Sequence, residues 1–94
     1  MNDMIKTAEE ISVLREGGAL LSRALAAAVA AVRPGVTTSE LDQIATRVIR
    51  EGGGEPSFLG YKTHTKDLPF PTTLCTSINH EVVHAPAVPA RVLV

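Results

Sequence analysis

The chain has 94 residues, which leaves room for one small domain that hides only about 60–65% of its unfolded surface. Nine Lys and Arg residues oppose ten Asp and Glu residues, and no basic run indicates binding to nucleic acid. The single cysteine excludes an intramolecular disulfide framework and suits a reducing cytosol. No apolar run is long enough to span a membrane, and no secretory signal is recognisable. We therefore expect a cytoplasmic protein with neither a membrane nor a nucleic acid as its partner.

A first amphipathic helix is predicted to begin after Thr7. Thr7 and Glu10 have the spacing of a capping box, in which each side chain accepts from the backbone N–H of the other residue. Apolar residues then recur every three or four positions on one helical face, over about 25 residues. They are Ile11, Leu14, Leu21, Leu25, Ala28 and Val32. The Pro-Gly pair at residues 34–35 ends the helix. The glycine pair at residues 17–18 is either a tolerated weakness of about 1 kcal/mol per glycine or a place where another backbone approaches closely.

A second helix is specified more strongly at its start. Thr37 as the N-cap places Glu40 at the third helical position, which makes another capping box. Val36 and Leu41 then form a hydrophobic staple across the first turn. Gly52 is expected as the glycine just past the helix end. The apolar stripe consists of Leu41, Ile44, Ala45 and Val48. Each predicted helix has one apolar face, which needs a sheet or another helix to cover it.

The second half of the chain favours short strands. Residues 57–61 are predicted to form a strand ending at a glycine and a tyrosine, and residues 81–84 can extend again after a turn. Residues 72–78 alternate, with Leu74, Thr76 and Ile78 on one face and Thr73, Cys75 and Ser77 on the other. The two aliphatic side chains favour the first face as the core face. The predicted fold is therefore α/β (α+β), with two amphipathic helices followed by antiparallel strands.

Residues 80–84 match the pattern H-E-x-x-H. In zinc peptidases this spacing works on a helix, where both imidazoles bind the metal and the glutamate is the general base. Here Pro86 follows His84 too closely for such a helix, and in a strand His80 and His84 would lie about 13 Å apart. A zinc site at His80, Glu81 and His84 and a plain surface turn are both kept as alternatives.

A third interpretation comes from the stretch Cys-Thr-Ser-Ile-Asn-His-Glu-Val-Val-His at residues 75–84. It resembles the signature strand of type I methionine aminopeptidases, whose pattern is a Cys, then Ser-Ile/Val-Asn, then Glu-Val-Val and a His. Residues 33–42 are similar to the stretch between the first two helices of that family. Residues 57–61 resemble its glycine-tyrosine strand, and residues 70–71 its aromatic-proline pair. The resemblance covers nearly the whole chain and implies the N-terminal part of a pita-bread fold.

The resemblance also implies an activity, which is removal of the N-terminal methionine from nascent polypeptides, with the ribosome as a further partner. It implies two divalent metal ions (Co, Mn, Fe or Zn) in the complete enzyme. The signature histidine corresponds to His84, which would be catalytic and substrate-binding because it hydrogen-bonds the scissile amide. Tyr61, Phe70 and Cys75 would contribute to the methionine pocket, where a thioether packs well against aromatic edges and sulfur. The alternative for these three residues is an ordinary core.

The metal ligands of that family are two aspartates, a histidine and two glutamates, all after the signature histidine. Asp3, Asp42 and Asp67 match none of these positions, so we assign no metal ligand in this chain. Residues 1–94 are expected to be the N-terminal portion of a methionine aminopeptidase-like domain, ending before the metal-ligand region. By itself the chain is then expected to be inactive. It is either a piece of a longer enzyme or a remnant that serves as a binding module.

Overall fold

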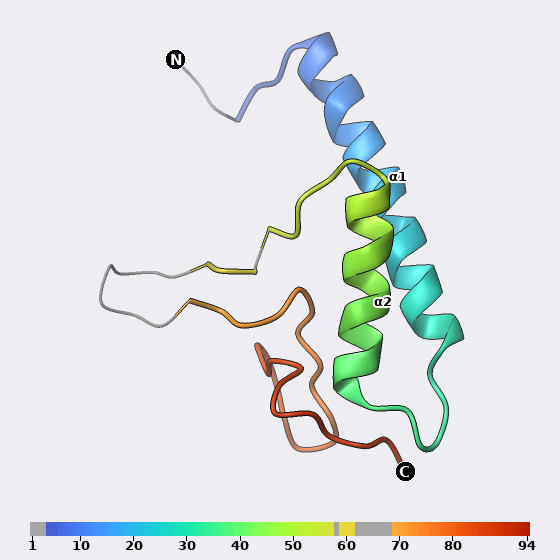
Figure 1. Ribbon diagram of the computed structural model, residues 1–94. Coiled ribbons are helices and arrows are strands. Elements are labelled where there is room, and N and C mark those ends of the chain that lie inside the picture. Colours follow the sequence, from blue (N-terminus) through green and yellow to red (C-terminus); the bar gives the residue numbers. More distant parts are fainter. Residues whose placement is uncertain (1–3, 58, 62–68) are drawn as a thin grey trace.

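A computed structural model describes residues 4–57, 59–61 and 69–94. Two helices, α1 (Ala8–Ala30) and α2 (Thr38–Glu51), run antiparallel side by side, and the segment from residue 69 onward lies beside α2 (Figure 1). The two predicted helices are thus confirmed. Within the described ranges, neither helix is long and apolar enough to cross a bilayer.

Both predicted capping boxes are present. The hydroxyl of Thr7 accepts from Glu10 N at 3.1 Å, and Thr7 N donates to Glu10 Oε1 at 2.8 Å. The hydroxyl of Thr37 likewise accepts from Glu40 N at 3.1 Å. An N-cap of this kind is worth about 1 kcal/mol. The two helix starts are therefore fixed by local chemistry.

The end of α2 differs from the prediction by one residue. Gly52 is the C-cap with φ −82°, whereas Gly53 takes the left-handed backbone with φ +84°. A Cβ on Gly52 or on Gly54 would collide with the side chain of Leu20. Gly52 therefore packs closely against the end of the Leu20 side chain of α1, and Gly53 provides the turn.

The packing face of α1 coincides with the predicted stripe only at Ala28. Ala24 and Ala28 are buried together with Leu41 and Ala45 of α2, so the helices meet through small side chains. Five large apolar residues of α1, together with Val32 just after the helix, form an outer stripe, 46–63% exposed. This outer stripe consists of Ile11, Leu14, Leu21, Leu25, Val29 and Val32. The periodicity indicated an apolar side correctly, but alanines let α2 approach on the neighbouring side.

The glycine pair of α1 is open to solvent in the described part of the chain. A Cβ built on Gly17 or on Gly18 meets no atom within 4 Å. The close approach of another backbone, which these glycines suggested, is thus not found among the described residues. The other interpretation, a tolerated weakness in the helix, is the one that fits the structure.

The predicted strands are not confirmed. Phe58, in the first of them, lies outside the described residues, and the described ranges contain isolated antiparallel bridges instead of strands: Cys75 with Pro86 and Thr37 with Val92. Five of the six prolines follow Gly54, and each removes a backbone donor that a ladder would need. The helical part of the predicted α+β fold is therefore confirmed, while the antiparallel strands remain a prediction.

The last residues are tied to the start of α2. Gly35 N donates to Leu93 O at 2.7 Å, and Leu93 N donates to Val36 O at 2.8 Å. Next to this pairing, Thr38 N donates to Arg91 O at 2.9 Å. Val36 and Thr38 are almost fully buried, with exposed fractions of 1% and 0%. The C-terminal segment thus completes the small core at the N-terminus of α2.

Candidate functional site

The segment that carries the signature histidine is a closed loop, which we call the His84 loop (residues 76–86). Thr76 N donates to Ala85 O at 2.7 Å, beside the bridge between Cys75 and Pro86. His84 is exposed and has a left-handed backbone, with φ 55°. That conformation costs a residue other than glycine about 1–2 kcal/mol. Conformations of this kind persist where the surrounding structure holds them, which is common at functional sites.

Two of the predicted pocket residues are brought together. Gly60 N donates to Phe70 O at 2.8 Å, and Phe70 N donates to Tyr61 O at 2.7 Å. These backbone contacts set Tyr61 and Phe70 opposite each other, with Tyr61 exposed and Phe70 half-buried. The pairing places two aromatic residues on neighbouring segments, and a thioether makes favourable contacts with aromatic rings.

Cys75 lies apart from Tyr61 and Phe70, in an apolar groove. It is half-buried, with a free thiol, and the groove of about 490 Å³ is formed by both helices and by residues 54–57 and 73–75. Leu20, Leu21 and Ala45 are among the other lining residues, whereas Tyr61, Phe70 and His84 are not. The described part of the chain therefore does not gather the predicted pocket residues in one cavity, and the complete pocket remains a prediction.

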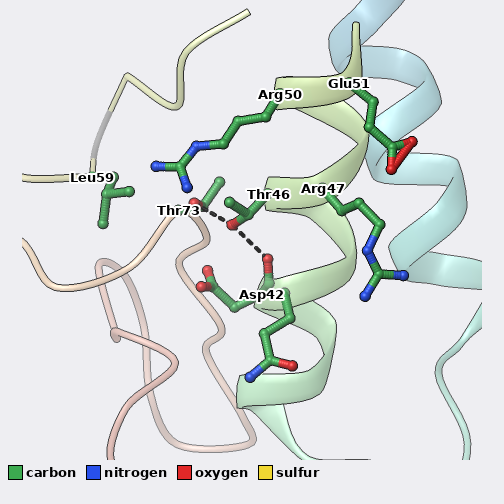
Figure 2. Close-up of a pocket in the computed structure, with 8 residues that line it drawn as sticks. Asp42, Thr46, Arg47, Arg50, Glu51, Leu59 and Thr73 are labelled. Carbon is green, nitrogen blue, oxygen red and sulfur yellow. Dashed lines mark hydrogen bonds between the residues drawn. The ribbon is translucent and has the colours of Figure 1, made fainter.

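The segment that leads to Cys75 is anchored on α2. Thr46 Oγ1 donates to Asp42 O at 2.8 Å and lies 2.6 Å from Thr73 Oγ1 (Figure 2). Leu74 N donates to Asp42 Oδ1 at 2.7 Å. Asp42, Thr46 and Thr73 line a hollow of about 440 Å³, whose wall also includes Arg47, Arg50, Glu51 and Leu59 (Figure 2). The carboxylate of Asp42 thus fixes the backbone beside Cys75, which is a structural role.

We expect the Cys75 thiol to be alkylated by a small reagent in the folded chain, because the groove beside it is open. Since the chain has one cysteine, uptake of iodoacetamide reports on Cys75 alone, and Cys75→Ser serves as the control without label. If the thiol also faces the methionine pocket of the complete enzyme, a methionine analogue should slow its alkylation there. A thiol that reacts only after denaturation would identify Cys75 as an inert core residue.

The pattern H-E-x-x-H does not lie on a helix. Residues 80–84 form a turn and a bend, and the left-handed backbone of Asn79 precedes them, with φ 54°. Glu81 Oε1 accepts from Ile78 N at 2.8 Å and also pairs with the Arg91 guanidinium. The Ile78 N–H and Arg91 hold the pKa of the Glu81 carboxyl below its usual range. Because this carboxylate is already paired and poorly basic, it is unsuited to act as the general base of a zinc peptidase.

The described residues do not fit a metal ion. Nowhere in residues 4–57, 59–61 and 69–94 do three His, Cys, Asp or Glu side chains come close enough together to bind one. Asp42 is engaged by Leu74 N, and Glu81 by Ile78 N and Arg91. Asp3 and Asp67 lie outside the described residues. The described residues therefore provide no set of metal ligands.

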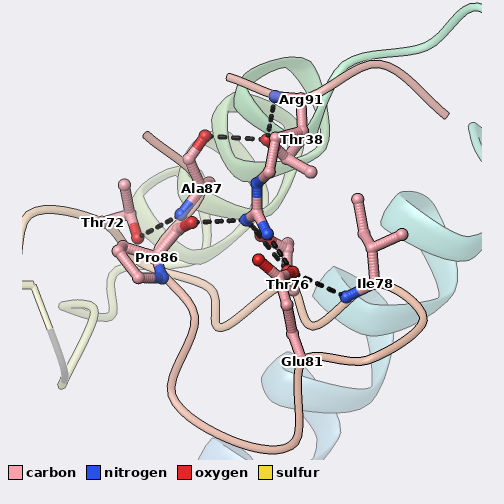
Figure 3. A network of polar contacts seen from close by, with 8 residues as sticks. All are labelled: Thr38, Thr72, Thr76, Ile78, Glu81, Pro86, Ala87 and Arg91. Carbon is pink, nitrogen blue, oxygen red and sulfur yellow. Dashed lines mark hydrogen bonds and ion pairs between the residues drawn. The ribbon is translucent and has the colours of Figure 1, made fainter. Parts of the chain in front are cut away.

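A polar network joins the His84 loop to α2 (Figure 3). The Thr38 hydroxyl donates to Ala87 O at 2.8 Å and accepts from Arg91 N at 3.0 Å. Thr72 Oγ1 accepts from Ala87 N at 3.1 Å and donates to Leu74 O at 2.8 Å. Sequence reasoning missed both Thr38 and Arg91. The one available signal was Arg91, the only Asp, Glu, Lys or Arg residue after Glu81.

Comparison with known proteins agrees with the resemblance. The sequence profile of metallopeptidase family M24 matches residues 12–93. Methionine aminopeptidase 1 of Mycobacterium tuberculosis (strain CDC 1551 / Oshkosh) is 42% identical over 88 residues, which are 94% of this chain and 31% of that protein. Methionine aminopeptidase of Aquifex aeolicus (strain VF5) is 40% identical over 75 residues, 80% of this chain and 29% of that protein.

A shorter relative also matches. The "Uncharacterized protein in adk 3'region" of Micrococcus luteus is 44% identical over 80 residues, which are 85% of this chain and 87% of that protein. The chain thus spans about a third of the two methionine aminopeptidases but most of this relative. The predicted resemblance to methionine aminopeptidases is confirmed, and the chain belongs to metallopeptidase family M24.

Proposed function

We propose that this chain is the N-terminal, substrate-binding portion of a cytoplasmic methionine aminopeptidase, which removes the first methionine from nascent polypeptides, in contact with the ribosome. The observation that carries the proposal is the identity of about 40% to methionine aminopeptidases over most of the chain. His84 is the catalytic residue of the proposal and hydrogen-bonds the scissile amide. A neutral imidazole suits this role because it has one donor and one acceptor nitrogen. The left-handed backbone of His84 supports it as well.

The rest of the proposed enzyme supplies the metal centre. Members of family M24 are metallopeptidases, and we infer two divalent ions (Co, Mn, Fe or Zn) whose ligands lie in the remainder of the domain. Such ions polarise the scissile carbonyl and activate water when they are bound. This chain contributes His84 on the substrate side, with Tyr61, Phe70 and Cys75 as pocket residues.

The outer stripe of α1 supports the view that these residues are part of a larger domain. Its six large apolar side chains, five on α1 and that of Val32 just after the helix, are each about half exposed or more. Soluble proteins rarely leave such a continuous apolar surface open. In the proposal, the remainder of the methionine aminopeptidase domain covers this stripe. The alternative is a remnant that binds peptides without cleaving them. The exposed outer stripe is equally compatible with this alternative.

The activity is tested in a chimera in which this chain replaces the matching segment of the Mycobacterium tuberculosis methionine aminopeptidase 1. We expect the chimera, supplied with cobalt or manganese, to release methionine from a Met-Ala peptide. The 94-residue chain alone, under the same conditions, should release none, because its described residues hold no metal-binding cluster. The assay follows free methionine by chromatography.

Two outcomes would contradict the proposal. A chimera that folds, as judged by circular dichroism, and binds metal but releases no methionine would favour the non-catalytic remnant. Methionine release by the chain alone would show that a complete site exists within the 94 residues. Calorimetry with zinc on the His80→Ala and His84→Ala variants would then test the H-E-x-x-H pattern directly.

A further inference from the structure

The Arg91 guanidinium contacts acceptor atoms on three residues of the His84 loop. One guanidinium nitrogen pairs with Glu81 Oε1, and the other donates to Pro86 O at 2.6 Å (Figure 3). The same second nitrogen donates to Thr76 O and Thr76 Oγ1, both at 3.0 Å. The side chain is only 29% exposed. Because the guanidinium is a planar fork with five N–H donors, a single Arg can satisfy several acceptors at fixed angles.

The acceptors of Arg91 are distributed along the whole His84 loop. Thr76 stands at its start, Glu81 in its middle and Pro86 at its end. His84 lies between the second and third of these points. The loop also contains one internal turn, in which Glu81 N donates to Ile78 O at 3.0 Å. The guanidinium therefore ties together three points of a segment that has no regular secondary structure of its own.

Arg91 itself is fixed by α2. Its backbone N donates to Thr38 Oγ1 at 3.0 Å, and its backbone O accepts from Thr38 N at 2.9 Å. Thr38 is fully buried in the first turn of α2. The position of the guanidinium is thus set by a regular helix and the core beneath it.

The negative charge on Glu81 strengthens its ion pair with Arg91. The Ile78 N–H, the Arg91 guanidinium and the nearby His80 all lower the pKa of the Glu81 carboxyl, against the opposing effect of burial. A group with a lowered pKa stabilises the fold above its ordinary pKa, and this contribution is lost as the pH falls through the lowered value. The Glu81–Arg91 pair is therefore fully charged at neutral pH.

We infer that Arg91 is a positioning residue for the proposed peptidase reaction: it holds the His84 loop in one shape, so that the His84 imidazole meets the scissile amide. This inference rests on the proposed function. His84 keeps its costly left-handed backbone only where neighbouring groups hold the loop, and Arg91 holds the loop on both sides of His84. A displacement of about 1 Å at a catalytic group can reduce the rate by about 10²-fold.

The test compares Arg91→Ala and Arg91→Lys with Arg23→Ala, which removes an exposed arginine on α1. In the 94-residue chain, amide hydrogen exchange of Thr76 and Ile78 is measured by NMR. We expect faster exchange at both amides in Arg91→Ala, because the loop opens, with unchanged exchange within α2. The backbone contacts of Arg91 with Thr38 do not need the side chain, so the core should remain intact.

The kinetic arm uses the same variants in the chimera. Arg91→Ala should lower kcat by about 10- to 100-fold with little change in KM, since misplaced His84 costs transition-state contacts rather than substrate binding. Arg91→Lys should fall between the wild type and alanine, because one ammonium cannot replace a planar fork. Arg23→Ala should match the wild type in both experiments.

Each result decides the inference. Unchanged amide exchange in Arg91→Ala would show that Arg91 does not hold the His84 loop, whatever the activity. Faster exchange with unchanged kcat would overturn the positioning role. A rise in KM with unchanged kcat would place Arg91 in substrate binding and would also contradict the positioning role. If the wild-type chimera folds and is inactive, the proposed function and the catalytic part of the inference fail together, while the exchange experiment still shows whether Arg91 holds the loop.

Discussion

Replacement of His84 by alanine in the chimera is expected to lower kcat for methionine release by about 10²–10⁴-fold. The variant loses the imidazole that we propose to hydrogen-bond the scissile amide but keeps a Cβ at a left-handed position, so the backbone of the loop should change little. Metal content, measured by elemental analysis, should stay near that of the wild type, because His84 is not assigned as a metal ligand. Steady-state kinetics with a Met-Ala peptide give kcat and KM separately.

Two matched variants sharpen this test. His84→Asn keeps a hydrogen-bond donor and acceptor, and asparagine tolerates the left-handed backbone, so its loss should be smaller than that of alanine. His80→Ala removes the exposed neighbouring imidazole and should matter far less. Equal losses at both histidines would favour the H-E-x-x-H interpretation. Loss of metal from His84→Ala would show that His84 is a metal ligand rather than a hydrogen-bonding group at the substrate.

The helices were predictable because their signals are local. The capping boxes at Thr7 and Thr37 need only residues three positions apart, and the structure contains both. The Pro-Gly stop and the glycine run after Glu51 act over a similarly short range. Local chemistry of this kind is independent of what the rest of the chain does.

The packing of the helices was not predictable in the same way. A repeat of three and four positions marks the apolar side of α1, but the sequence does not say which part of that side meets α2. The contact uses Ala24 and Ala28, whose small volume is a weak hydrophobic signal, and it leaves larger neighbours such as Leu21 exposed. Gly52 also packs against the side chain of Leu20, a contact between residues far apart in the sequence that no local pattern marks.

In the candidate site, too, local sequence patterns revealed some residues, and long-range contacts determine the others. His84 was proposed from a contiguous signature, and the backbone pairing of Tyr61 with Phe70 brings together two of the residues proposed with it, while the pocket itself stays a prediction. Arg91 and Thr38 act through contacts that span up to 53 positions, and no short-range pattern marks them. The strands predicted from alternation meet prolines on both sides, so isolated bridges replace ladders in the described residues.

Thr38→Val is expected to have the largest effect on stability, lowering the free energy of unfolding by about 2–4 kcal/mol. The Thr38 hydroxyl is completely buried and serves two partners at once, Ala87 O and Arg91 N. Valine has nearly the same shape but leaves both partners unpaired in the core, and each unpaired group costs about 1–3 kcal/mol. A small domain has only about 5–15 kcal/mol in total, so the shift in urea denaturation should be large.

Thr38→Ser is the matched control, since it keeps the hydroxyl and removes one buried methyl group, at a cost of about 1 kcal/mol. If serine and valine destabilise equally, packing rather than hydrogen bonding dominates at this position, and the hydroxyl is not what anchors Arg91. The valine variant should also release the backbone of Arg91 from α2. Exchange at Thr76 and Ile78 should then rise as it does in Arg91→Ala, because the guanidinium can hold the His84 loop only while its own backbone is anchored.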